Sequence, residues 1–295
     1  MTSTAYRPVV LAALLFLIAA AQPAAQPPAK AAPAPRRGGT LTYASAADVN
    51  NFDPALRGGT ISGAVKTLVY SSLVKETPSR EVKPDLATSW KVDGTVWTFT
   101  LRQGVKFHDG TPFTAQAVKY HYDRLFSSEN PQRASDWRPF LDRVEVVDDY
   151  TVRFHTRFPD PFFLQRLAAS SQIASPEAHK KYGRDIARNP VGAGPFKFKE
   201  WVPDVRVVLV RNDDYWGDKA YLDQVVIRPV PEAGARAIAL ESGDIQLADL
   251  ISPEDMPRLQ RMDDDKLVPE LDRIGRAAGA AQVSARGFPD AFDLP

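Results

Sequence analysis

A histidine and a carboxylate lie side by side at His108 and Asp109, in the stretch LRQGVKFHDGTPFTAQAVKY. The two could perform acid–base chemistry, but the carboxylate that orients a catalytic imidazole usually comes from elsewhere in the fold, and neighbouring residues at a strand end point to opposite sides. FHDGT is instead typical of a turn, because Asp109 can accept backbone hydrogen bonds and Gly110 can adopt a positive φ. We therefore favour a structural turn over a catalytic pair.

Other chemistry-bearing residues form no recognisable constellation. His121, His155 and His179 lie in unrelated segments, with no second histidine or carboxylate at metal-ligand spacing. The sequence contains no G-x-S-x-G elbow, P-loop or Rossmann fingerprint, and no cysteine to act as a nucleophile, a metal ligand or a lipidation site. No enzyme activity, metal site or cofactor is expected from these residues.

The elements around the His108 turn carry strand patterns. VWTFTLR predicts a half-buried strand, because Trp97, Phe99 and Leu101 alternate along it. VEVVDDYTVRFHTRF predicts a hairpin, and VRVVLVRN and LDQVVIRPV predict two further strands. The hairpin is expected to turn at Asp148 and Asp149 and to place four residues on one face, namely Tyr150, Val152, Phe154 and Phe158.

Helices are predicted between these strands. Thr114 can cap one helix, Ser175 followed by Pro176 begins a second that ends at Gly183, and residues 232–242 form a third that is closed by Gly243. The fold class is therefore mixed α and β.

Composition and the N-terminus indicate an exported globular protein. The chain has 295 residues, of which 44% are hydrophobic, and 37 Lys and Arg balance 36 Asp and Glu, so there is no basic field for nucleic acid. Residues 1–21 are typical of a signal peptide, with cleavage after Ala21 or Ala25. The Ala/Pro-rich residues 22–37 predict a disordered tether. We expect a periplasmic protein with no stable membrane insertion after cleavage, and not a lipoprotein.

Several long segments follow one another in a characteristic order: GGTLTYASAADVNNFDPA, VYSSLV, VKPDLATSWKVDGTVWTFTLRQGVKFHDGTPFTAQAVKY, VEVVDDYTVRFHTRFPDPFFLQRLA, NPVGAGPFKFKEW and RNDDYWGDKAYLDQVVIRPVPEAGARAIALESGDI. From about Gly38 to about Leu250 the chain resembles the family 5 extracellular solute-binding proteins of ABC transporters, the dipeptide, oligopeptide and nickel type. LRQGVKFHDGTPFTA is the most specific piece.

The resemblance implies a periplasmic binding protein of the Venus flytrap type. Residues 38–81 and 190–250 would form the body of the first lobe, and residues 82–189 an inserted peripheral subdomain. Residues 251–295 are expected to be an irregular tail, and the second lobe typical of the family is expected to be missing. A truncated or frameshifted gene product would explain that difference.

The function implied by the resemblance is solute capture rather than catalysis. Such proteins close two lobes over a peptide or other small solute and deliver it to an inner-membrane ABC permease complex. The identity of the solute and the oligomeric state stay open. Two alternatives from other classes also stay open: a secreted hydrolase acting on peptides or sugars, and a ligand sensor domain without a transport function.

The resemblance points to four candidate ligand-binding residues. Arg57, Gly58 and Gly59 follow NFDP in a loop that contributes to the cleft in relatives, and Arg57 could pair with a ligand carboxylate. An ordinary surface loop is the alternative. Trp137 lies where relatives place an aromatic residue near the cleft, with a core position as its alternative.

Overall fold

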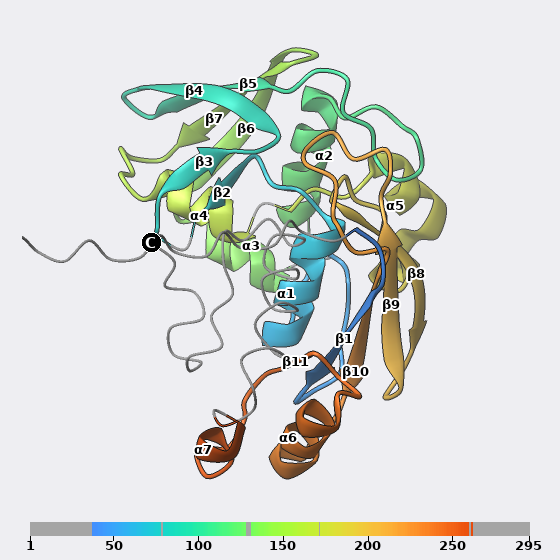
Figure 1. Ribbon diagram of the computed structural model, residues 1–295. Helices are drawn as coiled ribbons and strands as arrows, with labels where there is room; N and C mark the ends of the chain where they lie inside the picture. Colours follow the sequence, from blue (N-terminus) through green and yellow to red (C-terminus); the bar gives the residue numbers. More distant parts are fainter. Residues whose placement is uncertain (1–36, 78, 128–130, 171, 260, 262–295) are drawn as a thin grey trace, which may run out of the picture. The chain divides into compact units, whose positions relative to one another are not determined.

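A computed structural model describes residues 37–77, 79–127, 131–170, 172–259 and 261 (Figure 1). The expected signal peptide, all of the expected tether except Arg37, and the tail from residue 262 lie outside the described residues. Among the helices that the structure describes, none combines the length and the apolar character needed to cross a membrane.

The described chain contains both strands and helices, which confirms the mixed α/β prediction. The strands are β1 (Thr40–Ser45), β2 (Val74–Glu76), β3 (Val82–Pro84), β4 (Ala87–Asp93), β5 (Val96–Leu101), β6 (Leu141–Asp148), β7 (Thr151–Thr156), β8 (Phe196–Val202), β9 (Arg206–Arg211), β10 (Gln224–Pro229) and β11 (Leu247–Ala248). The helices are α1 (Thr60–Val69), α2 (Ala115–Leu125), α3 (Pro131–Trp137), α4 (Phe163–Ser170), α5 (Pro176–Tyr182), α6 (Ala233–Ser242), α7 (Met256–Leu259) and the 3-10 helix η1 (Gly183–Ala187).

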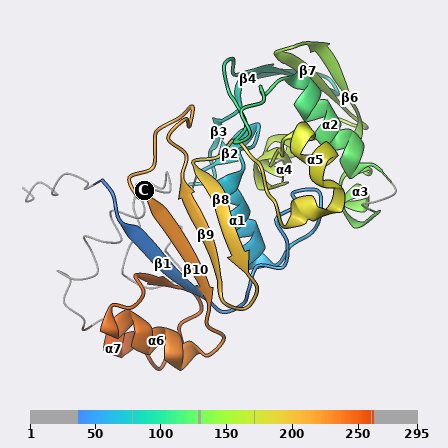
Figure 2. The same ribbon diagram turned by 90° about the vertical axis from the view of Figure 1, so that its right-hand side faces the viewer.

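One sheet joins the beginning of the described chain to its end. Its strand order is β11-β1-β10-β9-β8, in which β1 runs parallel to β10 and β11 while β9 is antiparallel to both its neighbours. Figure 2 shows β1, β10, β9 and β8 side by side. The predicted strands VRVVLVRN and LDQVVIRPV are therefore confirmed as β9 and β10.

A second sheet, β4-β5-β7-β6, is antiparallel throughout. The predicted hairpin is confirmed, since β6 pairs with β7 across a turn at residues 149–150. The alternation of VWTFTLR is also confirmed, because Trp97, Phe99 and Leu101 are all buried. Phe158 was expected on the same strand face as Val152 and Phe154, but β7 ends at Thr156, and Phe158 lies beyond the strand and is 45% exposed.

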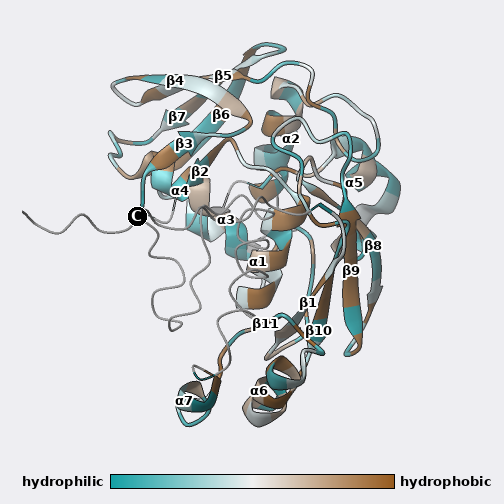
Figure 3. Cartoon of the chain, viewed as in Figure 1, coloured by the Kyte–Doolittle hydropathy of each residue, from teal (hydrophilic) through white to brown (hydrophobic). Residues whose placement is uncertain are grey.

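Each of these two sheets has its own apolar core. Helix α1 packs Ile61, Val65 and Val69 into the core of the β11-β1-β10-β9-β8 sheet, and Figure 3 shows the hydrophobic colour along this helix and the neighbouring strands. Helix α2 packs its apolar face into the core of the other sheet. Residues of the 174–186 segment belong to the α1 core. The division of the chain at residues 82 and 189 stays a prediction.

The helix signals in the sequence mark real ends. The Ser175 side chain accepts a hydrogen bond from the backbone N–H of Ala178, and Gly243 closes α6 in the left-handed conformation with φ of 80°. Thr114 occupies the N-cap position of α2, but its side chain makes no capping hydrogen bond.

The segment Gly192–Gly194 is the point where the two cores meet. The Gly194 N–H donates to the carbonyl of Val69 at the end of α1, at 2.9 Å. The Ala193 carbonyl accepts from Ser71 Oγ at 3.1 Å and from Trp216 Nε1 at 3.2 Å. Close approach is possible only because the segment has glycines: a Cβ on Gly192 would lie 2.1 Å from the Val69 oxygen.

The predicted turn at FHDGT is confirmed, and it is hydrogen-bonded to the Gly192–Gly194 segment. The His108 N–H donates to the Gly192 carbonyl at 2.8 Å, and its Nε2 lies 3.0 Å from the Gly194 carbonyl. Burial lowers the pKa of His108 to about 4, so the imidazole is neutral and Nε2 carries the donated proton. Asp109 instead accepts from Thr111 and from Ser175 Oγ, at 2.6 Å in the latter case. The adjacent His and Asp therefore serve different neighbours.

A buried ion pair fixes the loop between β1 and α1. The Asp53 carboxylate, which is 1% exposed, accepts from both terminal nitrogens of Arg124 on α2, with Oδ1 2.7 Å from Nη1. Burial acts to raise the pKa of Asp53, but the Arg124 guanidinium and the N–H of Ala55 outweigh it and lower that pKa. The loop is thereby tied to the second core.

Substituting Gly192 by Ala should reduce the free energy of unfolding by about 3 kcal/mol or more, because the Cβ must displace the end of α1. The matched control is Gly234→Ala on α6, where an added Cβ meets nothing within 4 Å and should be neutral or stabilise by up to about 1 kcal/mol. Urea unfolding followed by circular dichroism measures both. Similar stabilities for the two variants would contradict the packing argument.

Substituting Asp53 by Asn should cost about 2–4 kcal/mol at pH 7, because it leaves the buried Arg124 guanidinium without its counter-charge. Since the folded pKa of Asp53 is lowered, its stabilisation is present above the unfolded pKa of about 3.9 and is lost as the pH falls through the folded value. The difference between the native sequence and the variant should therefore shrink below about pH 4.

Urea unfolding at a series of pH values measures this difference. The control is Asp123→Asn, which removes an exposed pair with Lys119 and should cost under about 0.5 kcal/mol. A cost for Asp53→Asn that is the same at pH 3 and pH 7 would rule out the ionised pair as its cause.

Candidate functional site

The candidate site is the loop of residues 50–59, which connects β1 to α1. Strands β1, β10 and β11 are parallel, so their carboxyl ends lie at one edge of the sheet, and the chain leaves β1 at that edge. Ligands of open α/β sheets commonly bind outside the carboxyl ends of the strands. The topology therefore brings the predicted residues Arg57, Gly58 and Gly59 to a place suited to ligand binding.

A buried ammonium group holds the loop in shape from beneath. Lys66 on α1 is 3% exposed and donates to Asn51 Oδ1 at 2.9 Å and to the carbonyl of Asp53 at 2.8 Å. It also reaches the carbonyl of Leu56 at 3.3 Å. Burial lowers the pKa of Lys66 to about 8, although the Asp53 carboxylate opposes the shift. At neutral pH the loop is wrapped around a positive charge.

The two glycines bring the loop close to the start of α1. A Cβ on Gly58 would lie 2.8 Å from the Ser62 Cβ and 3.3 Å from Lys66 Nζ, whereas a Cβ on Gly59 would meet only Asn50 Nδ2, at 4.0 Å. Gly59 is the N-cap of α1, and the helix has neither a side-chain cap nor an acidic residue in its first turn. Helix N-termini attract anions through their N–H groups and the helix dipole. This end of α1 is thus open to an external anion.

Arg57 supplies a second group for anions. Its side chain is 54% exposed, and its Nε and Nη2 donate to the two oxygens of Asp136 on α3, with Nε 3.1 Å from Oδ2. The Asp136 carboxylate raises the pKa of Arg57. Planar two-point pairing of this kind is the geometry in which arginine recognises carboxylates and phosphates.

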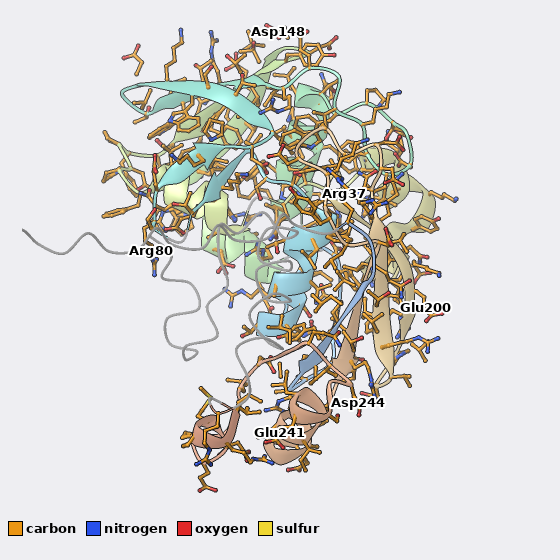
Figure 4. The ribbon with its side chains drawn as sticks, in the orientation of Figure 1. Arg37, Arg80, Asp148, Glu200, Glu241 and Asp244 are labelled. Atoms are coloured by element: carbon orange, nitrogen blue, oxygen red, sulfur yellow. The ribbon has the colours of Figure 1, made fainter. Side chains whose placement is uncertain are left out.

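Two further titratable residues near the loop, Arg133 and His121, are partly and fully buried. Arg133 on α3 is 15% exposed and lies 3.7 Å from the Asp136 carboxylate. Burial lowers the pKa of His121 to about 3, with the Arg124 and Arg133 charges adding to the shift, so this imidazole is neutral. Figure 4 shows that other charged side chains, such as the labelled Arg80, Asp148 and Asp244, lie at the outside of the protein.

Trp137 lies in the aromatic core of the second sheet. Its side chain is 3% exposed, and its ring meets Tyr122 at 5.4 Å and Phe163 at 6.5 Å between centroids, both edge to face. Trp137 is the last residue of α3, so its burial anchors the end of that helix in the core, one residue after Asp136. Ligand contact by Trp137 stays a prediction.

A separate pocket of about 400 Å³ lies between α2 and α5. Its lining includes Lys119, Tyr120 and Asp123 from α2 and Glu177 and Lys180 from α5, but no residue of the 50–59 loop. Each lysine already pairs with a neighbouring carboxylate, Lys119 with Asp123 and Lys180 with Glu177. The pocket therefore offers no unbalanced charge to a ligand.

The described residues contain no cluster of three or more metal-ligating side chains. His155 does meet a carboxylate, since its Nε2 lies 2.7 Å from Glu145 Oε2 across the β6–β7 hairpin, but this pair has no further metal-ligating neighbour. Arg57 is the group of the 50–59 loop that could hold an anion by charge and hydrogen bonds, although in this structure it pairs with Asp136.

The family resemblance pointed to Arg57 and the two glycines, whose contact with a ligand stays a prediction. It gave no indication of the charged residues that surround them in the structure, which are Asp53, Lys66, Arg124, Arg133 and Asp136. Lys66 carried a usable signal, because it is the lone charge in the otherwise uncharged helix TISGAVKTLV. Asp136 carried none, since it lies 79 residues from Arg57 in the sequence.

Comparison with known proteins shows which family the chain belongs to. Residues 81–282 match the family described as "Bacterial extracellular solute-binding proteins, family 5 Middle". The match extends beyond residue 250, where the recognisable sequence motifs ended. The chain is similar to the "Probable D,D-dipeptide-binding periplasmic protein DdpA" of Escherichia coli K12, with 34% identity over 235 residues, covering 75% of this chain and 45% of that protein.

Solved structures of periplasmic binding proteins also match the fold of this chain. The chain is similar to the periplasmic binding protein DppA of Helicobacter pylori in complex with peptide STSA, with a TM-score of 0.71, 32% identity and coverage of 78% of this chain and 50% of that chain. The oligopeptide-binding protein AppA of Bacillus subtilis, in complex with a nonapeptide, gives a TM-score of 0.72 at 29% identity, covering 78% of this chain and 47% of that one.

The chain spans about half the length of the curated relatives it matches, 45% in the case of DdpA. The periplasmic binding protein fold expected from the sequence is confirmed over the matched region. This chain belongs to the family 5 bacterial extracellular solute-binding proteins.

Proposed function

We propose that this chain is the substrate-binding component of a peptide-type ABC importer and acts in the periplasm. The observation that carries the proposal is the family match over residues 81–282. The similar proteins support a peptide solute, because DdpA is described as a D,D-dipeptide-binding periplasmic protein and DppA and AppA were solved with bound peptides. An inner-membrane permease complex would receive the solute.

The loop of Arg57, Gly58 and Gly59 is the part of the site that contacts the solute in this proposal. Arg57 pairs with a carboxylate of the peptide, and the open N-terminus of α1 adds a favourable field for the same charge. Trp137 contributes by anchoring the end of α3 in the core, and direct contact with the solute would require its side chain to leave that core.

The domain organisation belongs to the same proposal. Residues 38–81 and 190–250 form the body that carries the Arg57 loop, and residues 82–189 form the inserted subdomain that carries α2 and α3. Asp53 and Arg57 then bind the body to the subdomain through Arg124 and Asp136. The signal peptide at residues 1–21 directs export, and no covalent lipid anchor is expected because the chain has no cysteine.

Binding should depend on Arg57 and on the carboxylate of the peptide. In calorimetry with Ser-Thr-Ser-Ala, Arg57→Ala should weaken binding about ten-fold or more, the effect expected when a hydrogen bond to a charged group is lost. The C-terminal amide of the same peptide should bind the unsubstituted chain correspondingly more weakly. Mass spectrometry of the recovered peptide should find it intact.

The matched control is Arg143→Ala, which removes another exposed arginine paired with an aspartate but lies on β6. This variant should bind like the unsubstituted chain. Equal weakening by the two variants would contradict a specific role for Arg57, and release of peptide fragments would favour a hydrolase over a binding protein.

A further inference from the structure

The carboxylate of Asp136 occupies the edge of Arg57 that a solute carboxylate would use. Nε and Nη2 of Arg57 donate to one oxygen each, with Nε 3.1 Å from Oδ2. This is the two-point arrangement that arginine forms with any carboxylate. An incoming carboxylate must therefore displace Asp136 or bind beside it against the repulsion of a second negative charge.

Asp136 has another cation within reach when it gives up Arg57. Arg133 lies one turn earlier on α3, with Nη1 3.7 Å from Asp136 Oδ2, and such i,i+3 pairs face each other on a helix. Arg133 is also the less exposed of the two arginines, at 15% against 54%. Burial lowers the pKa of Arg133, while Asp136 opposes that shift by stabilising the charge. Asp136 therefore keeps its ion pair with Arg133 when Arg57 turns to a solute carboxylate.

Because the Arg57–Asp136 pair is exposed, a solute carboxylate can replace Asp136 at Arg57 at small cost in free energy. The side chains are 54% and 32% exposed, and ion pairs of that kind contribute little to stability. The Asp53–Arg124 pair in the same loop is 1% and 10% exposed, so it cannot exchange without leaving a buried charge. The loop therefore stays anchored while its outer arginine changes partner.

We propose that Asp136 is an internal stand-in for the solute carboxylate. In the absence of solute its carboxylate holds Arg57 in place. The strength of this pairing sets how strongly the site discriminates between solutes with and without a carboxylate. This inference rests on the proposed function, because it assigns a specificity residue to the same site. A solute with a free carboxylate replaces Asp136, while a neutral solute leaves the Arg57–Asp136 pair intact.

The test compares the unsubstituted chain with Asp136→Asn, using Ser-Thr-Ser-Ala and its C-terminal amide in calorimetry. Loss of the competing charge should tighten binding of the free acid about two- to five-fold, the range expected for an exposed ion pair, and leave the amide within about two-fold. The control is Asp142→Asn, which removes an exposed carboxylate from Arg143 and should change neither affinity.

A second measurement keeps the two proposals separable. Acetate is titrated into both proteins while the Nε–H resonance of Arg57 is followed by NMR, and Asp136→Asn should respond at lower acetate concentration. Failure of every peptide to bind, with this acetate response present, would reject the proposed peptide solute while still showing that Asp136 competes with carboxylates for Arg57. Unchanged or weaker binding of both the free acid and acetate by Asp136→Asn would overturn the stand-in, since Asp136 would then only position Arg57.

Discussion

The contact between Gly194 and the carbonyl of Val69 determines where the candidate site can lie. This hydrogen bond lies at the last residue of α1, Val69. The end of the helix can pack this closely against residues 192–194 only because Gly192 and Gly194 have no Cβ. Because the carbonyls of the same segment accept hydrogen bonds from His108, Ser71 and Trp216, elements of both cores are fixed to this one point. A buried backbone carbonyl without a partner is costly, so these donors also stabilise the segment itself.

Fixing the end of α1 also fixes its beginning. The helix runs back along the sheet from the edge where β1, β10 and β11 end, and its N-terminus stays at that edge with Gly59 as the cap. The Lys66 ammonium group then donates hydrogen bonds to Asn51 and Asp53 in the preceding loop, and the Arg57 side chain of that loop is exposed. The Lys66 charge around which the loop folds is buried, whereas the Arg57 charge that we propose for solute binding is exposed.

The sequence predicted what depends on local pattern. Alternation identified β5 and the β6–β7 hairpin, the glycine and the aspartate of FHDGT identified the turn, and Ser175 identified a helix start. Phe158 was misplaced because alternation does not reveal where a strand stops. The pairs Arg57–Asp136 and Asp53–Arg124 join residues 79 and 71 positions apart, and neither periodicity nor composition carries that information. The candidate loop came only from the family resemblance, and its supporting charges came only from the structure.

The loop takes part in two Arg–Asp ion pairs that behave differently because one is buried and the other is exposed. Asp53 and Arg124 are removed from water, where separating a pair leaves an unsolvated charge, so that pair behaves as a fixed fastening. Arg57 and Asp136 remain in contact with water, which solvates either partner when the pair opens, so that pair can exchange at small cost. A site that must capture and release a charged solute needs the second kind of pair at its surface and the first kind beneath it. Burial, more than residue identity, therefore separates the groups that maintain the loop from the groups that we propose to bind the solute.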